Sequence, residues 1–358
     1  MRLAAITSAL AIVLCAAVFG AILFEKRSGS GQSSAPALRA PVEASGTAGT
    51  VVATAVQASA ATRAPTVIAQ ASPPPPPSPW SAFSPPPCSN PNALGIARVV
   101  EIDTTGGPGF GVEHFKSHDF LREGEVVLTF DDGPWPKNTQ AVLSALAAHC
   151  TKAIFFPIGL HATYEPSILK QVAAAGHAIG SHTWCHQDLS KTKGRCNVNG
   201  KVQTVEYDPK DEIEMGISAV HWAVGGPTAP YFRFPALRQP QELIDYLGKR
   251  NIAIFSADMD SFDFKMRKPE QVRQSVMDKL KKHGKGIVLM HDFQHATAEA
   301  AMDLLNDLKA GGYKIVFMQP KFAVPTIAAY DEKLLKQVKG PGGGDARPTS
   351  TVVRTISE

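Results

Sequence analysis

Two neighbouring carboxylates, Asp131 and Asp132, stand in the sequence TFDDGP at residues 129–134. The apolar run Val126–Leu128 before them predicts a buried strand, and the Gly-Pro after them predicts a turn. Because successive strand residues point to opposite sides, the two carboxylates cannot both lie in the core. Burying carboxylates at the C-terminal end of a strand costs free energy unless a metal, a cation or a proton transfer requires them. The simpler alternative is a solvated loop.

Two histidines, His182 and His186, follow the strand-like segment 178–180. If this segment forms one helical turn, residues four apart share a face. That is ligand spacing for a metal that prefers nitrogen and oxygen donors. Together with one carboxylate, the pair would leave positions open for water and substrate, as catalytic metal sites do. The alternative is a pair of ordinary core or surface histidines.

Three further ionisable groups follow short apolar segments. Arg233 lies in the aromatic sequence YFRFP, and His291 ends the apolar run Ile287–Met290. Asp263 follows the apolar run Ile252–Ala257. Each group therefore stands at the C-terminal end of a predicted strand. In barrels of parallel strands, that end carries the chemistry.

These five segments, in this order, resemble the motifs of the polysaccharide deacetylase family, the NodB-homology domain of carbohydrate esterase family 4. The resemblance covers about residues 99–318. The segments are TFDDGP, the H-x-x-x-H of His182 and His186, Arg233-Phe234-Pro235, Asp260 to Phe264, and Leu289-Met290-His291. The chain departs from the family at two positions. It has Ala236 where the family usually has an aromatic residue, and Phe264 where the family usually has Trp.

The resemblance implies a divalent metal held by Asp132, His182 and His186. Zn²⁺ is the favoured ion, with Co²⁺ or another divalent ion as alternatives. A divalent metal polarises a carbonyl group and lowers the pKa of bound water, which is what hydrolysis of an unreactive amide requires.

The resemblance also implies the acid–base groups of such a site. Asp131 would be the general base, and Arg233 would fix its position. His291 would protonate the departing amine, while Asp263 would hold the imidazole and raise its pKa.

Three residues are expected on the substrate side of the site. The backbone N–H of Ala236 would contribute to binding the oxyanion. Leu289 would line a small pocket for the acetyl methyl group, and Phe264 would form a wall of the substrate groove.

The expected activity is metal-dependent hydrolysis of N-acetyl groups on an amino-sugar polysaccharide, either peptidoglycan, a chitin-like oligomer or an exopolysaccharide. One alternative is an O-acetyl polysaccharide esterase that uses the same site. Another is a non-catalytic carbohydrate-binding protein on the same barrel. The complete set of charged residues disfavours the last alternative, because a binding protein has no need of Asp131 beside Asp132.

The elements around these motifs alternate between strand and helix, which predicts an α/β fold with a parallel sheet and helices outside. We expect a distorted (β/α) barrel of about seven parallel strands, as the resemblance also implies. Strands are expected at Val126–Phe130, Ala153–Pro157, Ala178–Ser181, Tyr231–Phe234, Ile252–Ala257, Ile287–Met290 and Lys314–Met318, with Ala97–Thr104 as a further strand or hairpin. Helices are expected at Thr139–His149, Pro166–Ala175, Asp211–Val224, Gln241–Arg250, Pro269–His283 and Thr297–Ala310.

The two ends of the chain have a different composition. The apolar run Leu3–Phe24 has membrane-spanning length and lacks a clear cleavage site, so residues 1–27 are expected to be an uncleaved signal-anchor rather than a cleaved signal peptide. Residues 28–87 are rich in Ala, Ser and Pro, a composition that predicts a disordered linker. The deacetylase-like domain is expected at 88–320, followed by a mostly disordered extension at 321–358.

The cysteines indicate the compartment in which the protein works, and the net charge bears on which partners it binds. Cys88, Cys150, Cys185 and Cys196 form an even set in an apparently exported domain, which predicts two disulfides with three possible pairings. The pairs Cys88–Cys150 and Cys185–Cys196 are favoured. A formal net charge of +4 is too small to indicate nucleic acid. The expected partners are therefore an acetylated amino-sugar polysaccharide and, through the N-terminal segment, a membrane at the periplasmic or outer side of the cell.

Overall fold

The computed structural model describes residues 88–198 and 200–338. The predicted anchor, the linker and the last part of the C-terminal extension lie outside these residues. No helix in the described ranges is long and apolar enough to cross a membrane.

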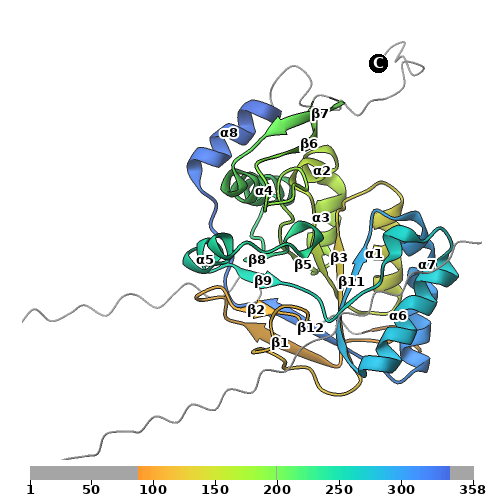
Figure 1. Ribbon diagram of the computed structural model, residues 1–358. Coiled ribbons are helices and arrows are strands. Elements are labelled where there is room, and N and C mark those ends of the chain that lie inside the picture. Colours follow the sequence, from red (N-terminus) through yellow and green to blue (C-terminus); the bar gives the residue numbers. More distant parts are fainter. Residues whose placement is uncertain (1–87, 199, 339–358) are drawn as a thin grey trace, which may run out of the picture. The chain divides into compact units, whose positions relative to one another are not determined.

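A chain of parallel strand pairings forms the centre of the fold (Figure 1). Strand β3 pairs with β11 on one side and with β4 on the other, and β4 pairs with β5. A parallel bridge between Ser181 and Phe232 joins the end of β5 to β8, which pairs with β9. These strands are β3 (Glu125–Asp131), β4 (Ile154–Phe156), β5 (Ala178–Ile179), β8 (Tyr231–Phe232), β9 (Ala253–Phe255) and β11 (Gly286–His291).

The ring closes through the chain itself. Strand β9 leads, after three residues, into β10 (Met259–Asp260), and β10 pairs with β11. Ladder pairing is thus interrupted between β9 and β10, which makes the expected barrel a distorted one. Three further strands flank the ring: β12 (Lys314–Pro320) pairs with β3 and β1 (Arg98–Ile102), and β2 (Gly109–Phe110) pairs with β9.

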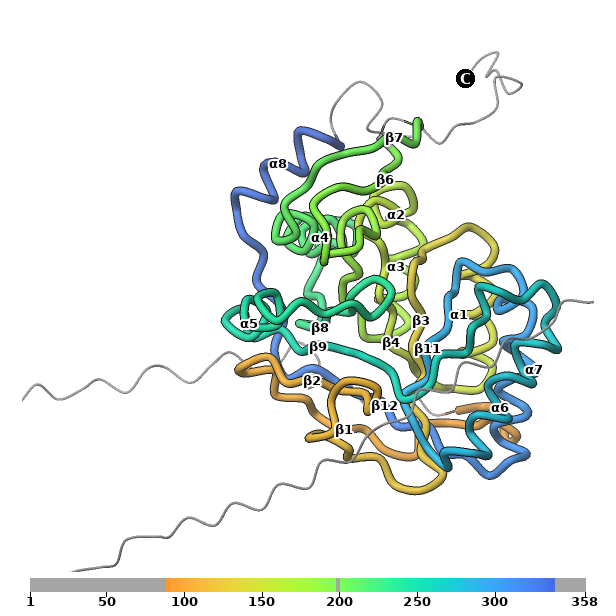
Figure 2. Tube along the Cα trace, in the orientation of Figure 1, coloured from red at the N-terminus to blue at the C-terminus, as the bar shows by residue number. Residues whose placement is uncertain are grey.

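Helices cover the outside of the sheet in two groups, visible in Figures 1 and 2. Helix α7 packs against α1 and α6 beside β3 and β11, and α4 packs against α2, α3 and α8. Helix α5 packs on β9. Their bounds are α1 (Asn138–Ala148), α2 (Gly159–Tyr164), α3 (Pro166–Ala174), α4 (Pro209–Val224), α5 (Gln241–Lys249), α6 (Pro269–His283), α7 (His295–Ala310) and α8 (Ala328–Val338).

Alternation along β3 directs its residues into two different environments. Val126, Leu128 and Phe130 belong to the cluster that includes leucines of α1, α6 and α7. Val127 belongs to a second cluster, which contains Phe156, Phe255 and Phe317 from the inner faces of other strands. Because side chains alternate along a strand, Asp131 points to the same interior as Val127. The sequence of β3 therefore delivers one carboxylate into the barrel.

The predicted set lacks several elements, among them the short strands β2 and β10. Strands β6 (Lys193–Val198) and β7 (Lys201–Glu206) form an antiparallel hairpin, and α2 begins directly after β4. Helix α8 lies in the extension that was expected to be mostly disordered, where Leu334 packs into a cluster with Met215 of α4. The hairpin is exposed and polar, so its residues carry no apolar pattern that would have predicted it.

The two favoured disulfides are present. Cys88 is bonded to Cys150, and Cys185 is bonded to Cys196. The first ties the start of the domain to the end of α1. The second ties the β6–β7 hairpin to the loop that carries His182 and His186.

We expect the Cys185–Cys196 bond to stabilise the folded domain by about 2–3 kcal/mol, because it closes a short loop of the unfolded chain. Replacing both residues by Ala should lower the free energy of unfolding by that amount in a denaturant titration without reductant. A matching titration of the wild type after reduction should show at least the same loss. Equal midpoints for the wild type and the double variant would contradict a structural role for this bond.

Candidate active site

The C-terminal end of β3 holds a buried ion pair. Arg233, fully buried, donates from Nη1 to Asp131 Oδ1 over 2.7 Å and to Thr129 Oγ1 over 2.7 Å. Its Nη2 donates to the backbone carbonyl of Ser256 over 2.8 Å, and its guanidinium lies 4.5 Å from the ring centroid of Phe156. One oxygen of Asp131 is thus occupied by Arg233, which leaves Oδ2 free to face the site.

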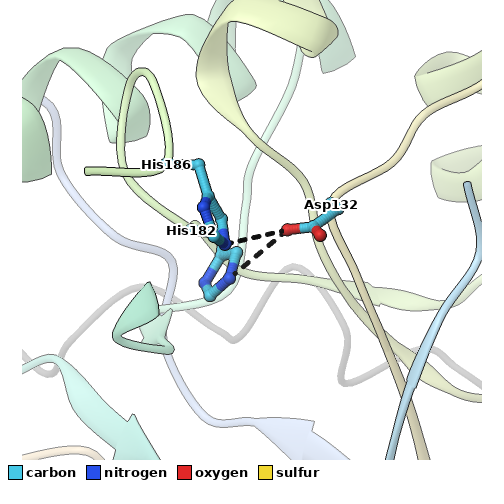
Figure 3. Close-up of side chains that lie close together, drawn as sticks. All are labelled: Asp132, His182 and His186. Atoms are coloured by element: carbon cyan, nitrogen blue, oxygen red, sulfur yellow. Dashed lines mark ion pairs between the residues drawn. The ribbon is translucent and has the colours of Figure 1, made fainter. Parts of the chain in front are cut away.

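Asp132 turns away from this interior and meets the two histidines of the second motif. Its φ of 72° places it in the left-handed region, which reverses the chain before Gly133. The Oδ1 atom lies 3.5 Å from His182 Nε2 and 3.4 Å from His186 Nε2 (Figure 3). Within the part of the chain that the structure describes, this Oδ1 is buried and has no hydrogen-bond partner.

These three residues fit a divalent metal. One donor atom from each lies within 4.8 Å of the others, and an orphaned buried carboxylate oxygen is costly unless a cation binds it. His182 Nδ1 lies 2.7 Å from the backbone carbonyl of Arg233, so Nδ1 carries the proton and Nε2 keeps its lone pair for a metal. Burial lowers the pKa of His182 to about 4, which keeps the imidazole neutral. The nitrogen and oxygen donors suit Zn²⁺ and similar ions.

The two histidines reach this position by a route that differs from the predicted one. Residues 182–189 contain no helix, so the expected helical turn is wrong. Thr183 and His186 both adopt a positive φ, of 68° and 55°, which folds the loop back on itself. The conclusion about a shared metal site stands, but the loop shape brings the imidazoles together and helical spacing does not.

Glu212 of α4 anchors this histidine loop. Its backbone carbonyl accepts from the N–H of Trp184 over 2.8 Å, and its Oε2 accepts from the N–H of Cys185 over 2.9 Å. The disulfide from Cys185 to Cys196 adds a covalent tie next to His186. The loop is therefore held at two consecutive residues, Trp184 and Cys185, directly before His186.

His291 and Asp263 form the second charged pair of the site. His291 Nδ1 lies 2.6 Å from Asp263 Oδ1, and Asp263 Oδ2 accepts from the backbone N–H of His291 and from Thr297 Oγ1. Burial lowers the pKa of His291, but the hydrogen bond and charge of Asp263 outweigh it and raise the pKa to about 9. His291 Nε2 lies 4.0 Å from Asp132 Oδ2, so the ring faces the candidate metal site.

Of the three residues expected on the substrate side, Leu289 and Phe264 lie near His291. Leu289 is buried and shares the face of β11 that carries His291. Phe264 is 46% exposed and its ring contacts the ring of His291 edge-on, at 5.5 Å between centroids. Ala236 is exposed and has a φ of 52°. That φ excludes proline at this position for steric reasons alone.

Two residues near the site were not assigned a role from the sequence. His161 places Nδ1 2.6 Å from the backbone carbonyl of Asp132. Asp292 accepts from the N–H of Gly133 and from Thr139 Oγ1, and burial raises its pKa to about 7. Its position directly after His291 was the signal in the sequence. The two side chains thus bind the carbonyl and the N–H of one peptide group, between Asp132 and Gly133.

Comparison with known proteins confirms the resemblance on which these roles depend. Residues 120–254 match the family model for polysaccharide deacetylase. The chain is 30% identical over 193 residues to peptidoglycan-N-acetylglucosamine deacetylase PgdA of Listeria monocytogenes, a match that covers 53% of this chain and 37% of that protein. It is 28% identical over 207 residues to a chitooligosaccharide deacetylase of Azorhizobium caulinodans, covering 58% of this chain and 90% of that protein.

A solved structure shares the fold. A peptidoglycan deacetylase of Bdellovibrio bacteriovorus superposes with a TM-score of 0.54 at 29% identity. The match covers 64% of this chain and 61% of that one. The common part is the parallel-strand α/β domain, so this similarity supports the predicted fold class.

A metal-binding experiment should distinguish the roles of the two neighbouring carboxylates, Asp131 and Asp132. Asp132→Asn should abolish tight binding of Zn²⁺ or Co²⁺, because a neutral amide is a poor ligand for a divalent cation. Asp131→Asn should retain near-stoichiometric metal, since Asp131 is occupied by Arg233. Metal content after dialysis, measured by atomic emission, gives the readout.

Folding must be checked in both variants, because Asp131→Asn leaves the buried guanidinium of Arg233 without its counter-charge. Circular dichroism and a thermal melt serve as that control. The reverse pattern, metal lost with Asp131→Asn and kept with Asp132→Asn in folded protein, would mean that the two roles are exchanged.

The anchor of the histidine loop should be sensitive to pH. Burial raises the pKa of Glu212 from 4.5 to about 7. As pH rises from about 4.5 to 7, the unfolded chain releases this proton while the folded chain retains it, so stability falls. The free energy of unfolding of the wild type should therefore drop by up to about 3 kcal/mol relative to Glu212→Gln across this window.

Denaturant titrations at several pH values measure this difference. Glu206→Gln, at an exposed carboxylate of the β6–β7 hairpin, is the matched control and should follow the wild type at each pH. Parallel curves for the wild type and Glu212→Gln would show that Glu212 ionises normally in the folded protein.

Proposed function

We propose that this protein, whose residues 120–254 match the polysaccharide deacetylase family, removes N-acetyl groups from an amino-sugar polysaccharide by hydrolysis. The observation that carries the proposal is the placement of Asp131 and His291 around one candidate metal site. Asp131 directly precedes Asp132, and His291 Nε2 lies 4.0 Å from Asp132 Oδ2. A base, an acid and a metal site in one place are the parts that amide hydrolysis requires.

The metal would be held by Asp132, His182 and His186, and Zn²⁺ is the ion we propose. When bound, it would supply Lewis-acid polarisation of the acetyl carbonyl and a more acidic water. The protein prepares the site for it through the His182 tautomer and the unpaired oxygen of Asp132. Asp132 and His186 both have a positive φ, a costly conformation that persists only where the surrounding structure fixes it, so these ligands would be held in place before any ion binds.

Asp131 would act as the general base. Arg233 binds its Oδ1, so the carboxylate cannot rotate freely and Oδ2 is aimed toward the site, 4.0 Å from His182 Nε2. A base held in one orientation removes a proton from water more effectively than a mobile one.

His291 would act as the general acid for the departing amine. With its pKa raised to about 9, the imidazolium is populated at neutral pH. Asp263 holds Nδ1, so the proton available for donation is the one on Nε2, which faces the site. An amine leaves as a neutral molecule only if it is protonated during cleavage of the C–N bond, and His291 supplies that proton.

The groups on the rim would select and orient the acetamide. The backbone N–H of Ala236 would help to bind the oxyanion, and Leu289 would contact the acetyl methyl group. Phe264 would contact the sugar ring. These roles come from the family resemblance, and the structure supports them by placing Leu289 and Phe264 beside His291.

The domain is proposed to work outside the cytoplasm, attached through the N-terminal segment. Two disulfides in the described residues are typical of an oxidising compartment. The relatives named above are deacetylases of peptidoglycan and chitooligosaccharides, so the substrate is proposed to be an acetylated amino-sugar polymer.

Acetate release tests the proposal. The purified protein should release acetate from a chitooligosaccharide or from peptidoglycan glycan strands, lose this activity after treatment with a chelator, and regain it with added Zn²⁺ or Co²⁺. His291→Ala should reduce turnover by about 10²–10⁴-fold while its metal content stays near that of the wild type. No acetate from any acetylated amino-sugar substrate, with metal bound, would refute the proposal.

A further inference from the structure

Two exposed aromatic rings extend outward from the catalytic histidine. Phe262 is 41% exposed and Phe264 is 46% exposed, although both are large apolar side chains. Their centroids lie 6.1 Å apart, and Phe264 in turn contacts His291. The rings therefore form a continuous surface that begins at His291 and leads away from it.

Two lysines lie against the outer ring. Lys265 Nζ is 4.5 Å from the centroid of Phe262 and 5.2 Å from that of Phe264. Lys279 Nζ approaches Phe262 to 4.6 Å and donates to Ser275 Oγ over 2.7 Å. Phe262 thus contacts two ammonium groups that come from different elements, the turn after β10 and helix α6.

The protein compensates this positive charge only in part. Within residues 88–198 and 200–338, neither Lys265 nor Lys279 forms an ion pair with a carboxylate at 4.0 Å or less. Asp260, in the same loop, attracts Lys279 electrostatically, and its Oδ1 accepts from the backbone N–H of Phe262 over 2.8 Å. Lys265 is therefore the less compensated cation, and a cation beside the rim of the site attracts anions.

The backbone also holds this arrangement under strain. Phe262 adopts a φ of 58°, in the left-handed region that bulky side chains avoid. Strain of this kind persists where the surrounding structure fixes it, and it concentrates at ligand sites. The residue in this strained conformation carries an aromatic ring that is exposed to solvent. A smaller residue would adopt the same backbone conformation at a lower free-energy cost.

The chemistry of the surface selects its ligand. The faces of pyranose rings pack on aromatic side chains, and ammonium groups bind carboxylates by charge-assisted hydrogen bonds. A neutral amino-sugar chain offers the rings a partner and offers the lysines none. A glycan that also bears carboxylates satisfies both.

We propose that Phe262, Lys265 and Lys279 form a subsite for a carboxylate-bearing sugar unit next to the N-acetylated sugar at His291. The inference rests on the proposed function and narrows its substrate class to anionic amino-sugar glycans over neutral ones. Lys265, the more exposed of the two cations, makes the direct contact, while Lys279 supports the ring and adds charge.

A matched pair of oligomers tests this. Chitopentaose is neutral, and chitopentaose oxidised at C6 carries carboxylates on the same backbone. The ratio of kcat/KM for the oxidised to the neutral oligomer, and the ratio of their dissociation constants by calorimetry, are measured on the full-length protein with Zn²⁺. The wild type should prefer the oxidised oligomer, and the preference should shrink as salt rises to about 0.5 M, because salt screens exposed charges.

Lys265→Gln should reduce the preference by about two- to fivefold, the usual value of an exposed charge pair, and Lys265→Arg should retain it. Lys309→Gln is the matched control. It removes an equal charge in the last turn of α7, about 20 Å along the helix from its start near His291, and should leave the preference unchanged.

Equal preference in the wild type and Lys265→Gln, by both kinetics and binding, overturns the inference. So does a wild type that binds the neutral oligomer as well as the oxidised one. If the wild type releases no acetate from either oligomer, the binding ratio still decides whether the cation-lined subsite exists. The proposed function is then tested separately, by acetate release from peptidoglycan glycan strands.

Discussion

The guanidinium of Arg233 is the group on which the rest of the site depends. It is fully buried, and a buried cation is tolerated only when its charge and its donors are satisfied. Asp131, Thr129 and the carbonyl of Ser256 provide those partners, so β3, β8 and the segment after β9 must meet at one point. The carbonyl of Arg233 itself then fixes the tautomer of His182. One ionic constraint inside the barrel therefore orients both Asp131 and His182.

Around this buried pair, the site is built from loops in costly conformations. Asp132, Thr183, His186, Ala236 and Phe262 all have positive φ values without being glycine. Hydrogen bonds to Glu212, Asp292 and Asp263, together with the Cys185–Cys196 bond, hold these loops in place. The stability of the strand ring and its helices thus supports a set of side chains whose geometry is fixed before substrate arrives.

The candidate site contains two charged pairs, Asp131 with Arg233 and His291 with Asp263. Asp131 pairs with the adjacent cation of Arg233, while the adjacent anion of Asp263 raises the pKa of His291, and both Asp131 and His291 border Asp132. Farther out, Phe262 and Phe264 present exposed apolar rings, and Lys265 lies against them. Charged groups therefore occupy the centre of the candidate site, and aromatic rings extend from it.

The sequence alone determined the strands that end in ionisable groups, the α/β class and the residue types of the candidate site, because short-range apolar patterns and ordered motifs encode them. It also favoured the two disulfide pairs found. It could not give the shape of the His182–His186 loop, which is no helix, or the left-handed backbone at Ala236. It also missed the β6–β7 hairpin and the contacts of His161 and Asp292. The hairpin is local, but its exposed strand β7 has no buried face that a sequence pattern could show. The contacts of His161 and Asp292 join residues that are distant in the chain: His161 lies 29 residues from Asp132, and Asp292 lies 159 residues from Gly133. Only the closed ring of strands brings such groups within hydrogen-bonding distance.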